Sequence, residues 1–227
     1  MAAAGSGERL GAGVPKAFVP LAGRPMIEWS LVALRACESV RSIVVAVPPG
    51  HEHDLAGDDL VVIDGGATRS RSVANALAET ETELVAIHDA ARPLLTSELV
   101  EELAARLDAA PDADAVIAAA PVTDTIKQAD TPQRCASAAD NAAKEQRKIV
   151  RTLDRTRLWA AQTPQVFRAG ALRAALAVDA DIRDAATDEA MLIEAAGGTV
   201  LIHPTPHPNP KVTTPLDLRL AELLLRP

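Results

Sequence analysis

Two glycines near the start of the chain have a spacing suited to binding a phosphate group. They lie in the segment AAGSG at residues 3–7, and Arg9 and Lys16 follow. Glycines two positions apart let backbone N–H groups converge on an anion without an obstructing side chain. Arg9 adds a fork of donors and Lys16 a mobile positive charge. The segment predicts a phosphate site, with a flexible, charged loop as the alternative interpretation.

This loop differs from the two common glycine-rich phosphate motifs. It lacks the GxxxxGK[ST] spacing of the P-loop, and it lacks the third glycine of the dinucleotide fingerprint. A dehydrogenase is therefore disfavoured.

A second glycine turn follows the apolar run at residues 60–63. Gly65 and Gly66 lead into TRSRSV at residues 68–73. Helix N-terminal amides, small hydroxyls and open backbone suit the polar edge of a nucleobase. The alternative is an ordinary strand-to-helix turn with a good cap.

The motif HDAARP at residues 88–93 follows the apolar run Leu84–Ile87. The carboxyl end of a parallel strand is the usual ligand crevice of an open α/β sheet. Asp89 there could bind a hydroxyl, hold a metal-bound water or orient Arg92. The alternative is an internal Asp89–Arg92 ion pair, and we expect His88 to be structural.

Later polar turns supply two cations and two hydroxyls. The cations are Arg155 and Lys211, and the hydroxyls belong to Thr125 and Thr187. Each turn alone is typical of a solvated surface. Together they suit a second phosphate carried by a small polyol.

The elements that must position these residues alternate along the chain. Short apolar runs at residues 42–47, 60–63, 84–87, 115–120 and 199–202 predict strands of a largely parallel sheet covered on both faces. We expect Ser97, Thr187 and Thr214 to cap helices. The alternation predicts an α/β fold with a doubly wound, mostly parallel, Rossmann-like sheet.

One polar stretch, residues 128–148, interrupts this alternation. It has no apolar period, which predicts a flexible excursion or a projecting arm. We expect residues 1–227 to form a single domain, with residues 126–150 as its projecting arm.

Composition and charge exclude several classes of protein. Lys and Arg total 23 against 31 Asp and Glu, for a net charge of −8, and aromatic residues make up 2%; both disfavour nucleic-acid binding. The two cysteines have neither disulfide-scaffold nor zinc-site spacing. Membrane-spanning runs and a signal peptide are not expected, so we predict a soluble, cytoplasmic protein.

The order of the motifs resembles the 2-C-methyl-D-erythritol 4-phosphate cytidylyltransferase family of the non-mevalonate isoprenoid pathway. The motifs are AAGSGERL, DGG with RSRSV, HDAARP, APVTDTIK, QTPQVF, TDEA and NPKVT. The resemblance covers nearly the whole chain. It implies a nucleotidyltransferase that joins CTP to methylerythritol phosphate by in-line attack on the α-phosphate, releasing pyrophosphate without a covalent enzyme intermediate.

The resemblance implies a role for each candidate residue. The catalytic candidates are Arg9 and Lys16, as transition-state stabilisers, and Arg155 and Lys211, which would position methylerythritol phosphate. The nucleotide-binding candidates are Ala3, Ala4, Gly5, Ser6, Gly7, Gly66, Ala67, Ser72, Asp89 and Ala90. The substrate-binding candidates are Asp89, Arg92, Thr125, Arg155, Thr187 and Lys211.

The resemblance also implies a cofactor and a partner. Mg²⁺ would bridge the CTP phosphates as a Lewis acid, with no dedicated protein cage. Residues 126–150 would form a β-arm that joins two copies into a homodimer, the alternative being a loop without a partner.

Three features depart from the family pattern. The family places an apolar strand before AAGxG, so we expect either a start upstream of Met1 or another segment in that slot. An empty slot would expose two strand edges and open a trough in the core. The arm is longer than usual, and Ala67 stands where a polar residue is common, which removes a side-chain contact near the base or ribose.

Two other functions stay open. A ribitol-5-phosphate cytidylyltransferase shares most of these motifs and uses a similar polyol phosphate. A non-catalytic nucleotide-binding module would need the loop glycines but not the four cations together.

Overall fold

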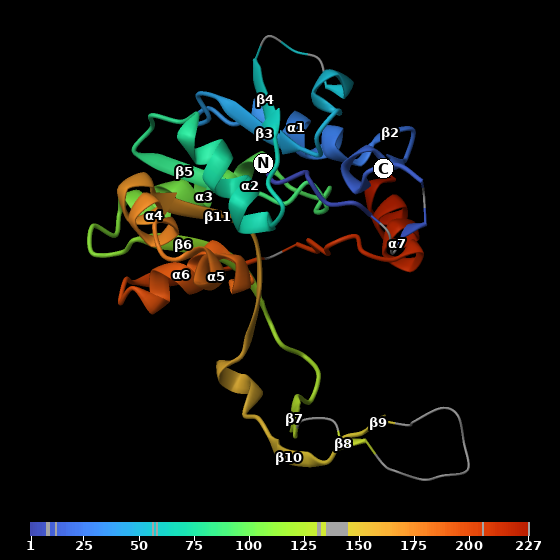
Figure 1. The fold of residues 1–227 in the computed structure, drawn as a ribbon, viewed down its shortest axis with the longest axis vertical. Helices are drawn as coiled ribbons and strands as arrows, with labels where there is room; N and C mark the ends of the chain where they lie inside the picture. The colour runs from blue at the N-terminus through green and yellow to red at the C-terminus, as the bar shows by residue number, and fades with distance from the viewer. Residues whose placement is uncertain are drawn as a thin grey trace. The chain divides into compact units, whose positions relative to one another are not determined.

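The chain folds into two compact units, drawn in Figure 1. The computed structural model describes residues 1–7, 10–11, 13–55, 57, 59–130, 133–134, 145–205 and 207–226. Unit 1 comprises Met1–Ala119 and Gln162–Pro227, and unit 2 comprises Ala120–Ala161. The strands β6 (Ala115–Pro121) and β11 (Trp159–Arg168) carry the chain from unit 1 into unit 2 and back.

Unit 1 contains the predicted α/β sheet. The strands β12 (Val200–Pro204), β6, β11 and β5 (Leu84–Ile87) lie side by side in that order. β12 pairs parallel with β6, and a second parallel pair joins β3 (Ile43–Val47) to β4 (Leu60–Asp64). All of β3 is buried, as expected for an apolar strand covered on both faces. The α/β prediction is confirmed, and all the predicted strands are present.

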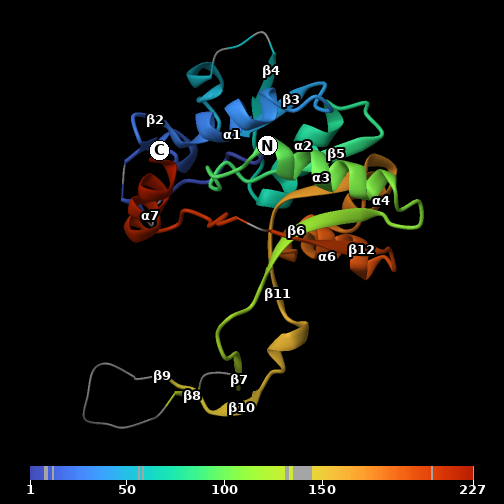
Figure 2. The same ribbon diagram turned by 180° about the vertical axis from the view of Figure 1, so that it is seen from behind.

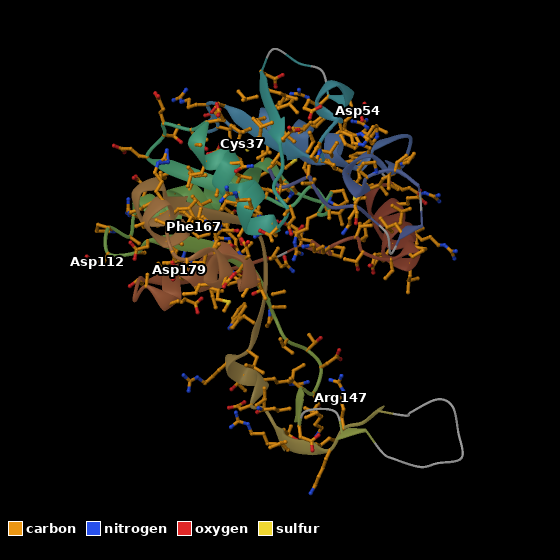
Figure 3. The ribbon with its side chains drawn as sticks, viewed as in Figure 1. Cys37, Asp54, Asp112, Arg147, Phe167 and Asp179 are labelled. Atoms are coloured by element: carbon orange, nitrogen blue, oxygen red, sulfur yellow. The ribbon has the colours of Figure 1, made fainter. Side chains whose placement is uncertain are left out.

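The strand β11 was not predicted from the apolar runs. It pairs antiparallel with β5, so the sheet is mixed. Its first three residues are exposed and its buried part begins at Thr163, which leaves no continuous apolar run to read. Phe167, near its end, is fully buried within unit 1 (Figure 3).

Residues 1–3 lie between the two sheets. Ala2 bridges in parallel to Ala46 at the end of β3 and to Asp89 just after β5. The Met1 nitrogen donates to the Val44 carbonyl oxygen at 2.6 Å. Beyond these contacts, the facing edges of β3 and β5 border a trough of about 490 Å³, which is lined by Ile43, Val85 and other residues. Residues 1–3 therefore occupy one end of the slot in which a strand is expected.

Helices cover both faces of the sheet, as Figures 1 and 2 show from opposite sides. The helices are α1 (Met26–Arg35), α2 (Arg69–Ala78), α3 (Ser97–Asp108), α4 (Ala169–Leu176), α5 (Ala180–Ala185), α6 (Glu189–Ala195) and α7 (Pro215–Leu225). Alternate side chains of β6 point to opposite faces: Ala115 and Ile117 pack with α2, α4 and α6, whereas Val116 and Ala118 pack with α3. Within the described ranges, no helix is long and apolar enough to cross a membrane.

Two of the three predicted helix caps are wrong by one residue. The side chain of Thr96, rather than Ser97, accepts from Leu99 N, and Asp188, rather than Thr187, accepts from Met191 N. Both neighbours in each pair have cap-forming oxygens, so the sequence does not separate them. Thr214 is confirmed as a cap, in a capping box with Asp217.

Short elements complete unit 1. They are the 3-10 helices η2 (Lys16–Phe18) and η3 (Glu52–Asp54) and the antiparallel pair β1 (Pro20–Leu21) and β2 (Arg24–Pro25). A small apolar cluster of Leu21, Met26, Val212 and Ala221 packs α7 against β1 and α1.

Unit 2 is a polar β-ribbon. β7 (Lys127–Ala129) pairs antiparallel with β10 (Ile149–Thr152), and β8 (Gln133–Arg134) pairs with β9 (Glu145–Gln146). Side-chain hydrogen bonds from Lys127 to Thr152 and from Arg151 to Gln128 link β7 and β10. The 3-10 helix η4 (Arg155–Arg157) follows. The polar stretch 128–148 is thus partly strand, while residues 131–132 and 135–144 lie outside the described residues.

Candidate active site

A cavity of about 690 Å³ lies where several chain turns of unit 1 meet. The turns follow residues 1–3, β4 and β5, and the loop before α7 joins them; the carboxyl ends of parallel strands are where open α/β sheets bind ligands. Twelve of the candidate residues line this one cavity: Ala3, Ala4, Gly5, Ser6, Gly7, Lys16, Gly66, Ala67, Ser72, Asp89, Ala90 and Lys211.

The first wall is the glycine loop. Gly7 has φ +74°, and a Cβ there would come within 3.0 Å of the Lys16 backbone. The Lys16 N–H donates to the Gly5 carbonyl oxygen at 3.1 Å. Gly7 is therefore required both by its backbone conformation and by close contact. This contact places Lys16, the first residue of η2, beside the loop.

The second wall is the glycine turn between β4 and α2. A Cβ on Gly65 would lie 2.4 Å from the Ala4 Cβ, so this glycine lets the two loops touch. Gly66 N donates to the Ser72 hydroxyl, which in turn donates to the Thr68 carbonyl oxygen, both at 3.0 Å. The buried Ser72 hydroxyl therefore supports the turn.

Asp89 lies in the third wall, just after β5, and holds two cations. Its Oδ1 accepts from Arg69 Nε at 2.8 Å, and its Oδ2 accepts from Lys211 Nζ at 2.6 Å. Burial opposes ionisation of Asp89, but the charges of Arg69 and Lys211 outweigh it and hold the pKa of this carboxyl well below its usual range. Asp89 is thus an ionised anchor for the Lys211 ammonium.

Arg92 and His88 form hydrogen bonds that stabilise the turn after β5. Arg92 Nη1 donates to the Asn209 carbonyl oxygen at 2.6 Å, which ties the turn after β5 to the loop before α7. The Asp89 carboxylate forms ion pairs with Arg69 and Lys211, and the Asp89–Arg92 ion pair stays an alternative interpretation. His88 is 1% exposed, and burial lowers its pKa to about 3.

The His88 ring has a definable protonation state. Its Nε2 lies 3.1 Å from the Arg92 carbonyl oxygen, which can only accept, so we assign the proton to Nε2. The Thr163 hydroxyl accepts from Asp89 N and lies 3.2 Å from His88 Nδ1, to which it donates. The neutral imidazole therefore supports the turn that carries Asp89.

The remaining candidates are Arg9, Thr125, Arg155 and Thr187. Arg9 falls outside the described residues. Thr187 is exposed before α6, with its hydroxyl 3.9 Å from Met191 Sδ. Thr125 and Arg155 belong to unit 2, where Arg155 donates to the Thr123 carbonyl oxygen.

Sequence reasoning missed Arg69 and Glu189. Arg69 begins α2, lines the cavity and bonds to Glu189 Oε2 at 2.5 Å as well as to Asp89. Glu189 begins α6 and is fully buried. The sequence shows Arg69 only as one arginine of TRSRSV and Glu189 only as the glutamate of TDEA. In both motifs a charged residue is typical of the protein surface, so neither residue was predicted to belong to the site.

Among the described residues, the cavity walls do not form a metal cage. The described residues contain no cluster of three or more His, Cys, Asp or Glu side chains able to hold a metal. Asp89 is the one described carboxylate that lines the cavity, and both its oxygens bond to cations. A metal ion bound through substrate phosphates and water fits this donor set, because magnesium characteristically keeps several waters.

The α/β fold and the glycine-lined cavity with its two lysines are those of a nucleotidyltransferase. Over residues 1–227 the chain matches the family IspD: 2-C-methyl-D-erythritol 4-phosphate cytidylyltransferase. The chain belongs to this family, which confirms the resemblance seen in the motifs.

Three similar proteins carry the name of this family. A 2-C-methyl-D-erythritol 4-phosphate cytidylyltransferase of Frankia casuarinae is 45% identical over 229 residues, covering 98% of this chain and 79% of the relative. A bifunctional enzyme IspD/IspF of Anaeromyxobacter dehalogenans is 40% identical over 99% of this chain, which spans 56% of that relative. The crystal structure of the 2-C-methyl-D-erythritol 4-phosphate cytidylyltransferase from Thermus thermophilus matches with a TM-score of 0.75 and 35% identity, covering 93% of this chain and 94% of that one.

Proposed function

We propose that this chain transfers the cytidylyl group of CTP to 2-C-methyl-D-erythritol 4-phosphate. The products are 4-diphosphocytidyl-2-C-methyl-D-erythritol and pyrophosphate. The observation that carries the proposal is that Lys16 and Lys211 line the same cavity as the glycine loop. Membership of the family narrows the substrates to this pair.

The reaction is a phosphoryl-group substitution. A phosphate oxygen of the polyol phosphate forms a bond to the α-phosphorus of CTP while the bond to the β-phosphate breaks. Pyrophosphate leaves on the side opposite the attacking oxygen and keeps the electron pair of the broken bond. Because negative charge grows on the leaving group, the protein's task is positioning and charge stabilisation.

The cavity walls suit separate parts of the two substrates. The glycine loop, residues 5–7, would hold the triphosphate, and Lys16 beside it would stabilise charge on the α- and β-phosphates. The glycine turn with Gly66 and Ala67 would face the cytosine. Lys211, held by Asp89 at 2.6 Å, would anchor the phosphate of the polyol.

The other candidates complete this assignment. Arg9 would bind the triphosphate, and Arg155 would bind the polyol phosphate. Ala90 would add a backbone contact to the ribose. Arg92, Thr125 and Thr187 would contact the polyol phosphate.

A magnesium ion would accompany CTP. Phosphate oxygens and water would hold it, and when bound it supplies Lewis-acid neutralisation of the phosphates. The protein's own residues orient the triphosphate around it.

The test is a pyrophosphate-release assay across nucleotides and polyol phosphates. We expect release with CTP and methylerythritol phosphate, and far less with UTP or ATP, or with ribitol 5-phosphate. Preference for ribitol 5-phosphate would reassign the acceptor. Tight CTP binding with no release from any acceptor would identify a non-catalytic nucleotide-binding module.

We further propose that residues 126–150 form a dimerisation arm and that the enzyme works in the cytoplasm. Ile149 and Val150 on β10 are 58% and 61% exposed. Their apolar side chains are suited to pack against a second copy of the chain. Light scattering should give the mass of a dimer, and I149D/V150D should give a monomer. A monomeric parent chain would contradict the arm's role.

A further inference from the structure

Four charged side chains form a continuous row of alternating sign that runs from the cavity into the core. Lys211 Nζ lies 2.6 Å from Asp89 Oδ2, and Asp89 Oδ1 lies 2.8 Å from Arg69 Nε. Arg69 Nη1 lies 2.5 Å from Glu189 Oε2. The four residues come from the loop before α7, the turn after β5, the start of α2 and the start of α6.

The inner end of the row is anchored. The Glu189 side chain is 0% exposed and Arg69 is 24% exposed, so the pair is shielded from solvent. Burial raises the pKa of Glu189, whereas for Arg69 the charges of Asp89 and Glu189 overcome burial and raise the pKa. A buried carboxylate is stabilised only by a well-aligned partner. For Glu189 Oε2 this partner is Arg69.

The geometry of Arg69 explains how this anchor reaches the cavity. A guanidinium is planar and presents its donors in fixed directions. Arg69 uses Nε for Asp89 and Nη1 for Glu189, so Glu189 determines the plane in which Arg69 meets Asp89. Occupation of Oδ1 by Arg69 leaves Oδ2 aimed at Lys211.

Without Arg69, the Asp89 carboxylate can rotate. Both of its oxygens then become equivalent partners for Lys211, whose side chain is long, flexible and 41% exposed. The ammonium would sample several positions in the cavity. Positional errors of about 1 Å at a reacting group can cost about a hundredfold in rate.

We propose that Arg69, braced by the buried Glu189, is a positioning residue that orients Asp89 and thereby fixes the Lys211 ammonium for the second substrate. The inference rests on the proposed function for the identity of that substrate. The orientation of Asp89 and Lys211 by Arg69 does not depend on the proposed function.

The kinetic test compares R69K and E189Q with the control R71K. Arg71 lies two positions along α2, is exposed and does not line the cavity. Lys at position 69 keeps the charge but lacks the fork, so we expect KM for methylerythritol phosphate to rise about tenfold or more, with KM for CTP changed far less. E189Q keeps an acceptor for Arg69 and should show a smaller shift of the same kind. R71K should match the parent chain.

A second measurement separates positioning from folding. Free guanidinium added at millimolar concentration should restore part of the activity of R69A, because it can occupy the vacated site. Equal losses for both substrates that track a lower melting temperature, with no guanidinium rescue, would overturn the proposal. Parent-like kinetics of R69K would also overturn it.

A crystal structure of R69K supplies a readout independent of activity. We expect the Asp89 carboxylate to be rotated and its contact with Lys211 to be lost or split over two conformers. An unchanged Asp89–Lys211 contact overturns the inference. If the parent chain proves inactive with every polyol phosphate while this rotation is observed, the proposed function fails and the positioning role stands.

Discussion

Lys211 and Asp89 are separated by 122 positions in the chain, yet Lys211 Nζ lies 2.6 Å from Asp89 Oδ2. The backbone supports this approach, because Val212 N donates to the Ala91 carbonyl oxygen at 2.8 Å. The loop before α7 is thus attached to the turn after β5 by both main chain and side chain. The attachment brings a cation from near the end of the chain to a cavity built from its first residues.

Replacement of Lys16 should reduce turnover without unfolding the protein. Loss of one preorganised donor at a site of developing charge costs about 10²–10³ in rate, so we expect K16A to lose that much in kcat/KM. The measurement is pyrophosphate release at saturating methylerythritol phosphate. R106A, on the exposed last turn of α3, is the control and should keep full activity; near-normal turnover of K16A would refute the role of Lys16.

Replacement of Gly7 should weaken CTP binding. Its φ of +74° is a conformation that costs other residues about 1–2 kcal/mol, and the added Cβ would come within 3.0 Å of the Lys16 backbone. We expect G7A to bind CTP about tenfold more weakly by titration calorimetry. Gly170 in α4 has open space around it, so G170A should bind CTP normally. Equal CTP affinity in both variants would contradict the tight contact.

Stability should fall in mild acid because His88 is buried and neutral. The unfolded imidazole takes up a proton below its ordinary pKa of 6.5, whereas the folded one does so only near pH 3. The depressed folded pKa means that the unfolded state binds more protons between these values. His88 therefore lowers the free energy of unfolding by about 1.4 kcal/mol per pH unit as the pH falls through this window. Denaturant titrations measure the slope, and NMR titration of the ring that showed an ordinary pKa in the folded protein would contradict it.

Filling the trough between β3 and β5 should stabilise unit 1. A short extension of valine and isoleucine added before Met1 would continue the bridges of Ala2 along both strand edges and bury apolar side chains. Each buried Val or Ile contributes about 1.5–3 kcal/mol, so the melting temperature should rise by several degrees. The extension also replaces the Met1 ammonium, whose pKa burial lowers to about 6, with a neutral amide. A Gly-Ser extension of equal length is the control, and equal melting temperatures would show that the trough does not accept a strand.

Much of the fold could be predicted from the sequence, because strands buried on both faces need apolar residues at every position. This is why β3 and β5 fell within the predicted runs. β11 could not be predicted, because its first three residues are exposed and polar residues interrupt the rest. The caps Thr96 and Asp188 were assigned to their neighbours because adjacent side chains offered the same chemistry.

The residue types of the site could be identified without a structure: loop glycines, lysines and an aspartate follow one another in the order of a recognisable family. The contacts between these residues emerge only in the folded chain. Folding joined Asp89 to Arg69 and Lys211 and joined Arg69 to Glu189 across 120 positions, and it buried Glu189 in the core. The physical reason is that pairing and burial of charges depend on distances between elements, and those distances are set by how helices and strands pack rather than by spacing along the chain.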